Sequence, residues 1–323
     1  MAMHYGTVPG IEKPISRLVQ GTASYNTGDP ESVFESLDTA LELGFNAFDT
    51  AQVYGEDKER LFGRWVRERD VRDKVVILAK GAHHSERPRV TPEDITTDLT
   101  NTLSFMELPS VDLYVLHRDD PKVPVGPIVE ILNEHKKAGR INAFGGSNWS
   151  YSRIAEANAY ANEHGLTPFA VSSPNFSLAE QVEEPWDNCV TISGPRGAEA
   201  RAYYAKEQTP LFTWSSLAGG FWSGRFDRAA AGDHSGYFDA LVVKCYCYEQ
   251  NFQRLDRAKI LAAEKGLSIP QVAMSYVMSC PLNVFALVFC ADRAQFEANS
   301  AALDVKLTDA EMAWLDLRSE TRG

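Results

Sequence analysis

The chain has 323 residues, of which 44% are apolar and 24% charged, and this composition is typical of a globular protein with an extensive core. Its net charge of −12 argues against a partner nucleic acid, and no basic run offsets that charge. No apolar stretch reaches the roughly 20 residues that cross a bilayer, and the first ten residues do not resemble a signal peptide. We therefore expect a cytoplasmic protein with no membrane partner.

The cysteines follow no ligand or redox pattern. They are Cys189, Cys245, Cys247, Cys280 and Cys290, an odd number without the spacing of a zinc site or of a C-x-x-C pair. Cys245 and Cys247 are close enough to share a metal, but no histidine lies between or beside them. We expect reduced thiols and no metal.

Strand-like and helix-like segments alternate along the chain. Residues 1–16 predict a hairpin that turns at Gly10. Eight short apolar runs then predict strands at 17–23, 46–51, 74–81, 111–118, 142–148, 168–174, 210–216 and 284–290. The longest irregular segments are expected at about 177–200 and 225–248.

Helical patterns separate these strands. The segment 31–44 has helical apolar spacing and ends in a glycine, and 91–106 opens with a threonine cap followed by proline. Two capping boxes, Ser268 with Gln271 and Thr308 with Glu311, predict further helix starts.

Eight strands, each followed by a helix, predict an α/β protein with a (β/α)₈ barrel and an N-terminal hairpin. We expect one domain spanning residues 1–323. The alternative is an open doubly wound sheet, which usually carries G-x-G-x-x-G after its first strand. Here the first strand is followed by "GTASYNTGD", which lacks that spacing.

Polar residues stand at the ends of three consecutive strands. Asp49 ends the second strand with Tyr54 just beyond it, Lys80 ends the third, and His117 ends the fourth. Each residue alone has a structural explanation: a turn cap, a loop aromatic, a strand-end lysine and a core histidine. In a barrel of this kind the chemistry lies at the carboxyl ends of the strands, so their joint occurrence predicts a site.

These four residue types suit proton transfer to a carbonyl oxygen. A free tyrosine has a pKa near ~10. We expect the Lys80 ammonium to lower the pKa of Tyr54, Asp49 to hold Lys80, and His117 to orient a carbonyl or share the proton. Such a tyrosine suits hydride transfer between a cofactor and a small carbonyl or alcohol.

The sequence here resembles the aldo-keto reductase family. "GFNAFDTAQVYGEDKERLFG" is similar to that family's first signature, and Asp49, Tyr54, Lys80 and His117 match its catalytic tetrad. "GGSNW" and "TWSSLAGGFWSGR" match its motifs on strands five and seven. The resemblance covers residues 17–317 and implies a nicotinamide-dependent reductase or dehydrogenase, with Tyr54 as general acid.

The resemblance also implies a set of cofactor-binding residues. Ser147 and Asn148 would bind the nicotinamide amide, and Trp214 would stack on its ring unless it is a core aromatic. The full expected set is Gly21, Thr22, Asp49, Ser147, Asn148, Ser173, Trp214, Ser215, Leu217, Gly219, Gly224, Arg225, Arg293, Gln295 and Asn299. Arg225 would supply positive charge to the pyrophosphate.

The sequence departs from the family after strand eight, where "FCADRAQFEANS" replaces the usual small residues and the polar group that would hold a 2′-phosphate. Asp292 adds negative charge there, Arg293 offers compensation, and Ala298 replaces a glutamate. In strand six, Ser173 stands in place of the usual glutamine. The family favours NADP(H), and NAD(H) stays open.

The motif "LHRDDPKVPVGPIVEILNEHKKAGRINAFGGSNWS" resembles a branch related to aryl-alcohol dehydrogenases. Candidate substrate residues are Tyr25, Arg118, Trp149 and Trp222. Arg118 either binds an acidic or hydroxylated substrate or pairs with Asp119 or Asp120.

Two other classes stay open. One is a regulatory or binding protein, because channel β subunits share this fold and keep the tetrad. The other is a lyase or hydrolase, which would need a metal or a paired-carboxylate site. Asp119 and Asp120 are adjacent in sequence, but neighbouring side chains need not converge.

Overall fold

The computed structural model describes residues 3–84, 86–229 and 236–322. An antiparallel hairpin, β1 (Tyr5–Val8) with β2 (Ile11–Ser16), precedes a closed eight-stranded barrel. The hairpin turns at Gly10 as predicted, where φ is +87° and a Cβ would lie 2.9 Å from the backbone oxygen of Asn142. Glycine meets both demands without strain.

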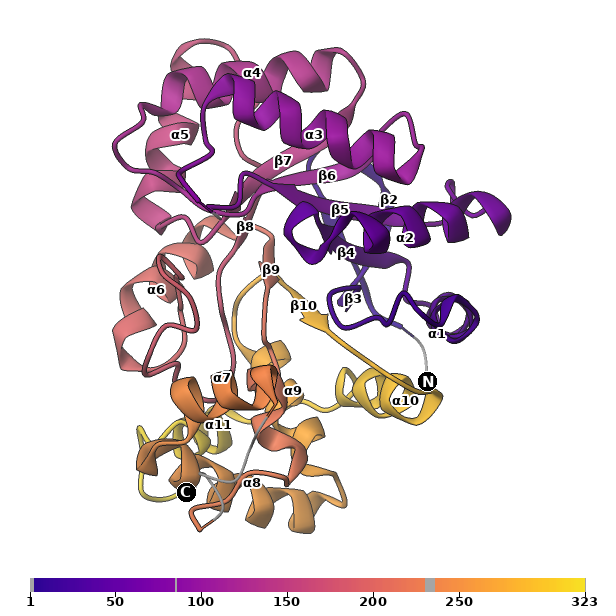
Figure 1. The fold of residues 1–323 in the computed structure, drawn as a ribbon. Helices are drawn as coiled ribbons and strands as arrows, with labels where there is room; N and C mark the ends of the chain where they lie inside the picture. Colours follow the sequence, from indigo (N-terminus) through magenta and orange to yellow (C-terminus); the bar gives the residue numbers. More distant parts are fainter. Residues whose placement is uncertain (1–2, 85, 230–235, 323) are drawn as a thin grey trace.

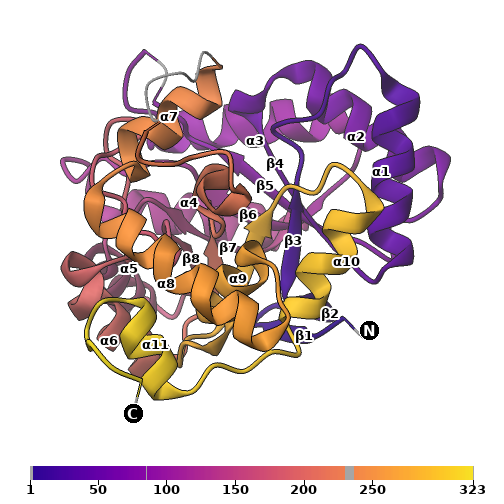
Figure 2. The same cartoon turned by 90° about the horizontal axis from the view of Figure 1, so that it is seen from below.

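All eight predicted barrel strands are present and parallel, and they close in the order β10-β3-β4-β5-β6-β7-β8-β9. Their bounds are β3 (Leu18–Gly21), β4 (Ala47–Ala51), β5 (Val76–Gly81), β6 (Val111–Leu116), β7 (Ile141–Ser147), β8 (Val171–Ser173), β9 (Leu211–Thr213) and β10 (Val284–Val288). Figure 2 shows the strands in the middle with helices around them. The predicted barrel with an N-terminal hairpin is confirmed.

The helices cover the outside of the barrel (Figure 1). They are α1 (Pro30–Glu42), α2 (Glu56–Glu68), α3 (Pro92–Met106), α4 (Val125–Lys137), α5 (Tyr151–Glu163), α6 (Ala198–Glu207), α7 (Tyr237–Tyr246), α8 (Glu249–Lys265), α9 (Ile269–Ser279), α10 (Arg293–Ala302) and α11 (Asp309–Leu315). The described residues also include the 3₁₀ segments η1 (Gln52–Tyr54), η2 (Pro195–Gly197) and η3 (Ala218–Ser223). Both predicted capping boxes form, at α9 and α11. None of the helices described is both long and apolar enough for a bilayer crossing.

The prediction that 225–248 is irregular is wrong in its second half. Residues 237–246 form α7, whose buried Val242, Cys245 and Tyr246 have helical spacing. The backbone N–H of Val182 donates to the carbonyl of Cys245 at 2.9 Å, which ties the loop after β8 to α7. The other irregular segment, 177–200, ends in η2 and the start of α6.

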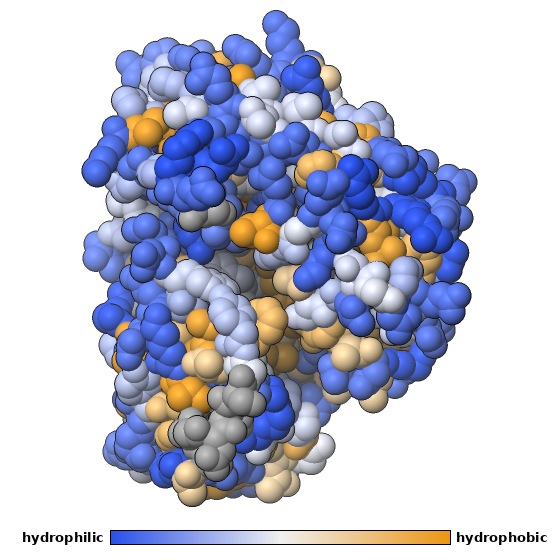
Figure 3. Space-filling model, in the orientation of Figure 1, coloured by the Kyte–Doolittle hydropathy of each residue, from blue (hydrophilic) through white to orange (hydrophobic). Residues whose placement is uncertain are grey.

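The barrel interior is an apolar cluster that the hairpin closes at one end. Val8, Ile11 and Ile15 of the hairpin pack with inward side chains such as Val76 and Leu113. In Figure 2 the hairpin and α7 lie at opposite ends of the barrel. The face that carries α7 is therefore the open, carboxyl end, and Figure 3 shows it hollowed at its centre with apolar groups around the hollow.

Candidate active site

Strand alternation carries three predicted residues into the barrel mouth. Successive side chains of a strand point to opposite faces. A residue two positions after an interior residue therefore also points into the barrel. On β5, Val76 and Leu78 belong to the interior cluster, and Lys80 follows at the same parity. The same rule places Asp49 above Ala47 on β4, and His117 above Val115 just after β6.

Tyr54 reaches this group from η1. Its hydroxyl donates to Oδ2 of Asp49 at 3.2 Å and accepts from Nζ of Lys80 at 3.3 Å. Lys80 and Asp49, both buried, form an ion pair. The Tyr54 and His117 rings are 6.2 Å apart and nearly perpendicular. The structure thus brings the four predicted catalytic residues together.

Gly55 makes the turn that holds Tyr54 in place. It ends η1 and precedes α2 with φ +114° and ψ +143°, a region that favours glycine. The segment η1 follows β4 directly, and the hydroxyl of Tyr54 reaches back to Asp49 across the four residues between them.

The electrostatics of Tyr54 differ from the expectation. Burial raises the pKa of Tyr54 well above its usual value, the Asp49 carboxylate raises it further, and Arg118 opposes these effects. The sequence predicted a lowered pKa from Lys80 alone, and that prediction is wrong in its net direction. The main reason is burial, which disfavours the phenolate, and Asp49 adds to the shift because it accepts the phenol's hydrogen and stabilises the protonated form.

Burial also shifts the pKa values of Asp49, Lys80 and His117. Burial raises the pKa of Asp49 and lowers that of Lys80, while their ion pair opposes both shifts. Burial, together with the charges of Lys80 and Arg118, lowers the pKa of His117 well below 6.5, so the imidazole is neutral at pH 7. Its buried Nδ1 has no partner among the described residues.

The expected nicotinamide residues lie at neighbouring strand ends. Gly21, Ser147, Ser173 and Trp214 end or follow β3, β7, β8 and β9, and Trp214 is half-buried. The buried hydroxyls of Thr22 and Ser173 have no hydrogen-bond partner within the described ranges. Unpaired buried hydroxyls in a mouth fit a polar ligand, so this end suits the group that the resemblance implies.

Asn148 is already engaged by the protein. Its Nδ2 donates to the carbonyl of His117 at 3.1 Å, and its Oδ1 accepts from the backbone of Val190 at 3.0 Å. It adopts φ +58°, where asparagine is among the tolerated residues. Asn148 therefore joins the end of β6 to the loop after β8, and Ser147 donates to the carbonyl of Ser173 at 2.9 Å.

The loop after β9 has the backbone of an anion cradle. Left-handed φ values recur along it, at Ser215, Ala218, Gly219, Gly220 and Gly224, and such turns can point backbone N–H groups at an anion. Leu217 precedes η3. Arg225 ends the loop, where its Nη1 pairs with Asp239 at 2.9 Å.

The expected adenine side is less open to a phosphate. Arg293 pairs with Glu42 at 2.5 Å and with Glu297 at 3.7 Å. Asp292 caps α10, and its carboxylate accepts from the backbone of Gln295 at 2.9 Å. Asn299 donates to Sγ of Cys290 at 3.2 Å. A 2′-phosphate here would meet the charge of Asp292 and a guanidinium that already has two partners.

The four candidate substrate residues are all buried but do not form one group. Arg118 and Trp149 lie together, since the Trp149 indole donates to the Arg118 carbonyl at 3.1 Å. The Tyr25 hydroxyl bonds Gln20 and Ser36, and its ring packs on Phe289 near the end of β10. Trp222 packs on Phe221 in the core.

Two features of the structure were not predicted from the sequence. His83 packs its ring against His117, with centroids 5.0 Å apart, and its place three residues after Lys80 was the available signal. The loop after β8 supplies Trp186, whose indole donates to the hydroxyl of Tyr237 at 2.8 Å, and both aromatics are exposed. No local pattern predicts that pair.

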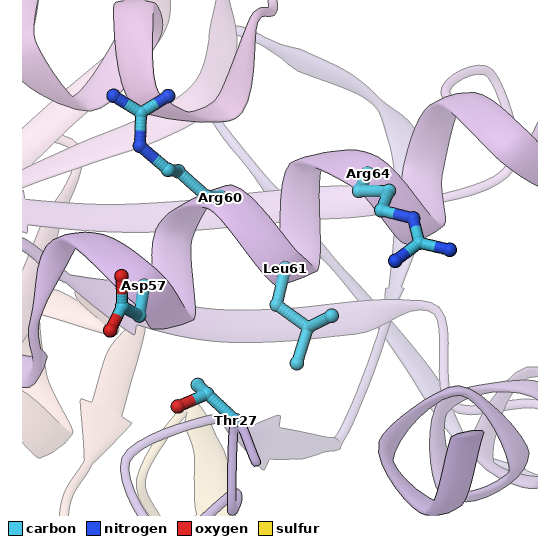
Figure 4. Close-up of a pocket in the computed structure, with 5 residues that line it drawn as sticks. All are labelled: Thr27, Asp57, Arg60, Leu61 and Arg64. Carbon is cyan, nitrogen blue, oxygen red and sulfur yellow. The ribbon is translucent and has the colours of Figure 1, made fainter. Parts of the chain in front are cut away.

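The hollow in Figure 4 lies elsewhere. It has a volume of about 270 Å³ and is lined by Thr27, Asp57, Arg60, Leu61 and Arg64. It lies beside α2 and includes no member of the Asp49, Tyr54, Lys80 and His117 group.

The fold and this group define the class of protein, a parallel eight-stranded barrel with an acid, a phenol, an amine and an imidazole gathered at its mouth. The model of the Aldo/keto reductase family matches residues 17–318. The chain therefore belongs to this family, whose fold and chemistry are those of oxidoreductases of carbonyls and alcohols.

Individual relatives agree with the predicted branch. A probable voltage-gated potassium channel subunit beta of Oryza sativa subsp. japonica is 25% identical, over 83% of this chain and 81% of its own. A probable aryl-alcohol dehydrogenase of Saccharomyces cerevisiae is 24% identical, over 88% of this chain and 87% of its own. The solved structure of the thermostable aldo-keto reductase Tm1743 has a TM-score of 0.73 at 20% identity, over 98% of this chain and 100% of its own.

Proposed function

We propose that this protein is a nicotinamide-dependent oxidoreductase that interconverts an aldehyde or ketone and an alcohol. Tyr54 is the general acid and base, Lys80 and Asp49 tune it, and His117 orients the carbonyl. One observation carries the proposal: the Tyr54 hydroxyl lies 3.3 Å from Nζ of Lys80 and 3.2 Å from a carboxylate oxygen of Asp49, beside the neutral His117.

Reduction needs a proton donor at the carbonyl oxygen. The bound nicotinamide supplies the hydride. The raised pKa of Tyr54 keeps its proton in place at neutral pH, so the phenol is ready to donate it to the developing alkoxide. Lys80 then stabilises the phenolate, and the Arg118 charge acts in the same direction. In the alcohol-oxidising direction the same phenolate is the base.

The residues expected to hold the nicotinamide end are Thr22, Ser147, Asn148, Ser173 and Trp214. The unpaired hydroxyls of Thr22 and Ser173 support this assignment. NADP(H) is the cofactor that the family favours, and NAD(H) is the alternative. Asp292 and the ion pairs of Arg293 support the alternative.

The test is Tyr54→Phe, with reduction of 4-nitrobenzaldehyde followed by NADPH or NADH absorbance. We expect kcat to fall by about 10²- to 10⁴-fold, the usual contribution of a general acid. Cofactor binding, followed by tryptophan fluorescence, should stay nearly unchanged. Tyr151→Phe is the matched control, because that hydroxyl bonds the exposed Glu199. Full activity in Tyr54→Phe would show that the assignment is wrong.

The second candidate is a regulatory or binding protein of the same fold with little turnover. The similarity to the probable potassium channel subunit beta of rice supports this candidate. Cofactor binding without measurable carbonyl reduction across a panel of aldehydes and ketones would support this candidate against the first.

A further inference from the structure

Arg118 is a buried cation beside the catalytic group. It follows His117 directly, and 4% of its surface is exposed. The one hydrogen bond that its side chain makes to a described residue runs from Nη1 to the His117 carbonyl, at 2.9 Å. Its charge influences the pKa values of Tyr54, Lys80, His83 and His117, so it lies close to the reacting groups.

The carboxylates around Arg118 are engaged elsewhere. Asp119 pairs with Arg153 at 3.2 Å, and Oδ1 of Asp120 accepts from the backbone of Lys122 at 3.1 Å. Glu184, on the loop after β8, accepts from the backbone of Cys189 at 3.2 Å. Within the described part of the chain Arg118 has no ion-pair partner, so the pairing with Asp119 or Asp120 considered from the sequence does not form.

The charge of Arg118 is therefore not neutralised by an ion pair within the described residues. Asp49 and Lys80 neutralise each other. Burial lowers the pKa of His83 to about 4 and also lowers those of His84 and His117, so none of the three carries charge at pH 7. Among the described carboxylates, the charge of Asp120 opposes that of Arg118 at His84, and the charges of Glu184 and Asp187 oppose it at Cys189, but none of the three forms an ion pair with Arg118.

A buried guanidinium without a counter-ion is costly for a fold, and a charged ligand would offset that cost. The planar guanidinium is suited to two parallel hydrogen bonds with a carboxylate. The Arg118 guanidinium lies against the His117 backbone, where its Nη1 donates to the carbonyl at 2.9 Å, so one small molecule can reach the Arg118 guanidinium with a carboxylate and His117 with a carbonyl.

We propose that Arg118 binds a carboxylate on the substrate, so that the preferred substrates are aldehydes or ketones that also carry an acidic group. This inference rests on the proposed carbonyl reduction. The competing role for Arg118 is to stabilise the Tyr54 phenolate, which would promote the reduction of every carbonyl equally.

A pair of probes of matched shape separates the two roles. Steady-state kinetics compare 4-carboxybenzaldehyde with the neutral 4-formylbenzamide, in the native protein, Arg118→Met and Arg118→Lys. We expect the native protein to favour the acid by about 10- to 100-fold in kcat/KM, the usual strength of a hydrogen-bonded charge pair. In Arg118→Met this ratio should fall to near one, and Arg118→Lys should retain part of it.

Arg60→Met is the control, because Arg60 is an exposed arginine of α2 that pairs with Glu56, and its ratio should equal that of the native protein. A native protein without preference for the acid overturns the proposal. So does an Arg118→Met variant in which both rates fall and the ratio persists. If Arg118→Met does not fold, the native ratio and Arg118→Lys still decide.

A binding measurement separates failure of this inference from failure of the proposed function. Benzoate and benzamide are titrated into the native protein and followed by tryptophan fluorescence, with no turnover required. Tighter binding of benzoate, lost in Arg118→Met, supports the carboxylate site even in a protein that reduces no carbonyl. Equal binding of both compounds overturns it.

Discussion

Glu59→Gln is expected to stabilise the fold at pH 8 much more than at pH 5. Glu59 lies fully buried on α2, where Oε1 accepts a hydrogen bond from the Thr102 hydroxyl at 2.9 Å. Its Oε2 has no partner in the described structure. Burial is the main cause that raises the pKa of this carboxyl from 4.5 to about 7.

The sign of the pH dependence follows from which state, folded or unfolded, binds the proton of Glu59 more tightly. Below pH 4.5 the carboxyl of Glu59 is protonated in both the folded and the unfolded chain. Between 4.5 and about 7 the unfolded chain releases the proton first, so the free energy of unfolding falls as pH rises. The shift of about 2.5, from 4.5 to about 7, sets a ceiling of about 3 kcal/mol on this loss.

Glutamine keeps the acceptor for Thr102 and removes the titration. Its amide nitrogen takes the place of an unpartnered oxygen, which costs a similar amount at every pH. The informative quantity is therefore the change in Tm between pH 5 and pH 8, compared between Glu59→Gln and the native protein. We expect a difference of about 2 kcal/mol, which is about 3 °C for a chain of this size.

Differential scanning fluorimetry at fixed scan rate measures these Tm values. Glu68→Gln is the matched control on the same helix, because Glu68 is exposed and pairs with Arg64. Its effect should be the same at both pH values. A Glu59→Gln effect that does not depend on pH would show that the carboxyl of Glu59 is not protonated in the fold, and the reasoning would fail.

Two further predictions concern the site. With substrate saturating, kcat for reduction should show no inflection from His117 or Tyr54 between about pH 6.5 and 9, because the pKa of His117 lies below that interval and the pKa of Tyr54 lies above it. An inflection in that interval that disappears in His117→Gln would contradict this prediction. Asp292→Ser keeps a residue that caps α10 and removes a negative charge, so fluorescence titrations should show the affinity for NADPH rising about 3- to 10-fold relative to NADH. An unchanged ratio would mean that the 2′-phosphate does not bind beside Asp292.

The barrel and the grouping of Asp49, Tyr54, Lys80 and His117 at its mouth could be predicted from the sequence. Buried parallel strands are short apolar runs, and helix starts carry local capping signals such as Ser268 with Gln271, so both are visible in the order of residues. The strand ends then follow, because alternation along β4 and β5 carries Asp49 and Lys80 inward. These features depend on near neighbours in the chain.

The pKa shifts of the site residues and the partners of their side chains could not be predicted from the sequence. The direction of the Tyr54 pKa shift depends on burial and on the hydrogen bond that its hydroxyl donates to Asp49. Neither is visible in the spacing of the two residues along the chain. Among the described residues Arg118 has no ion-pair partner, and one reason is that Arg153, on α5, pairs with Asp119. Such outcomes arise from contacts between residues that are distant in sequence and from desolvation, and neither leaves a local pattern.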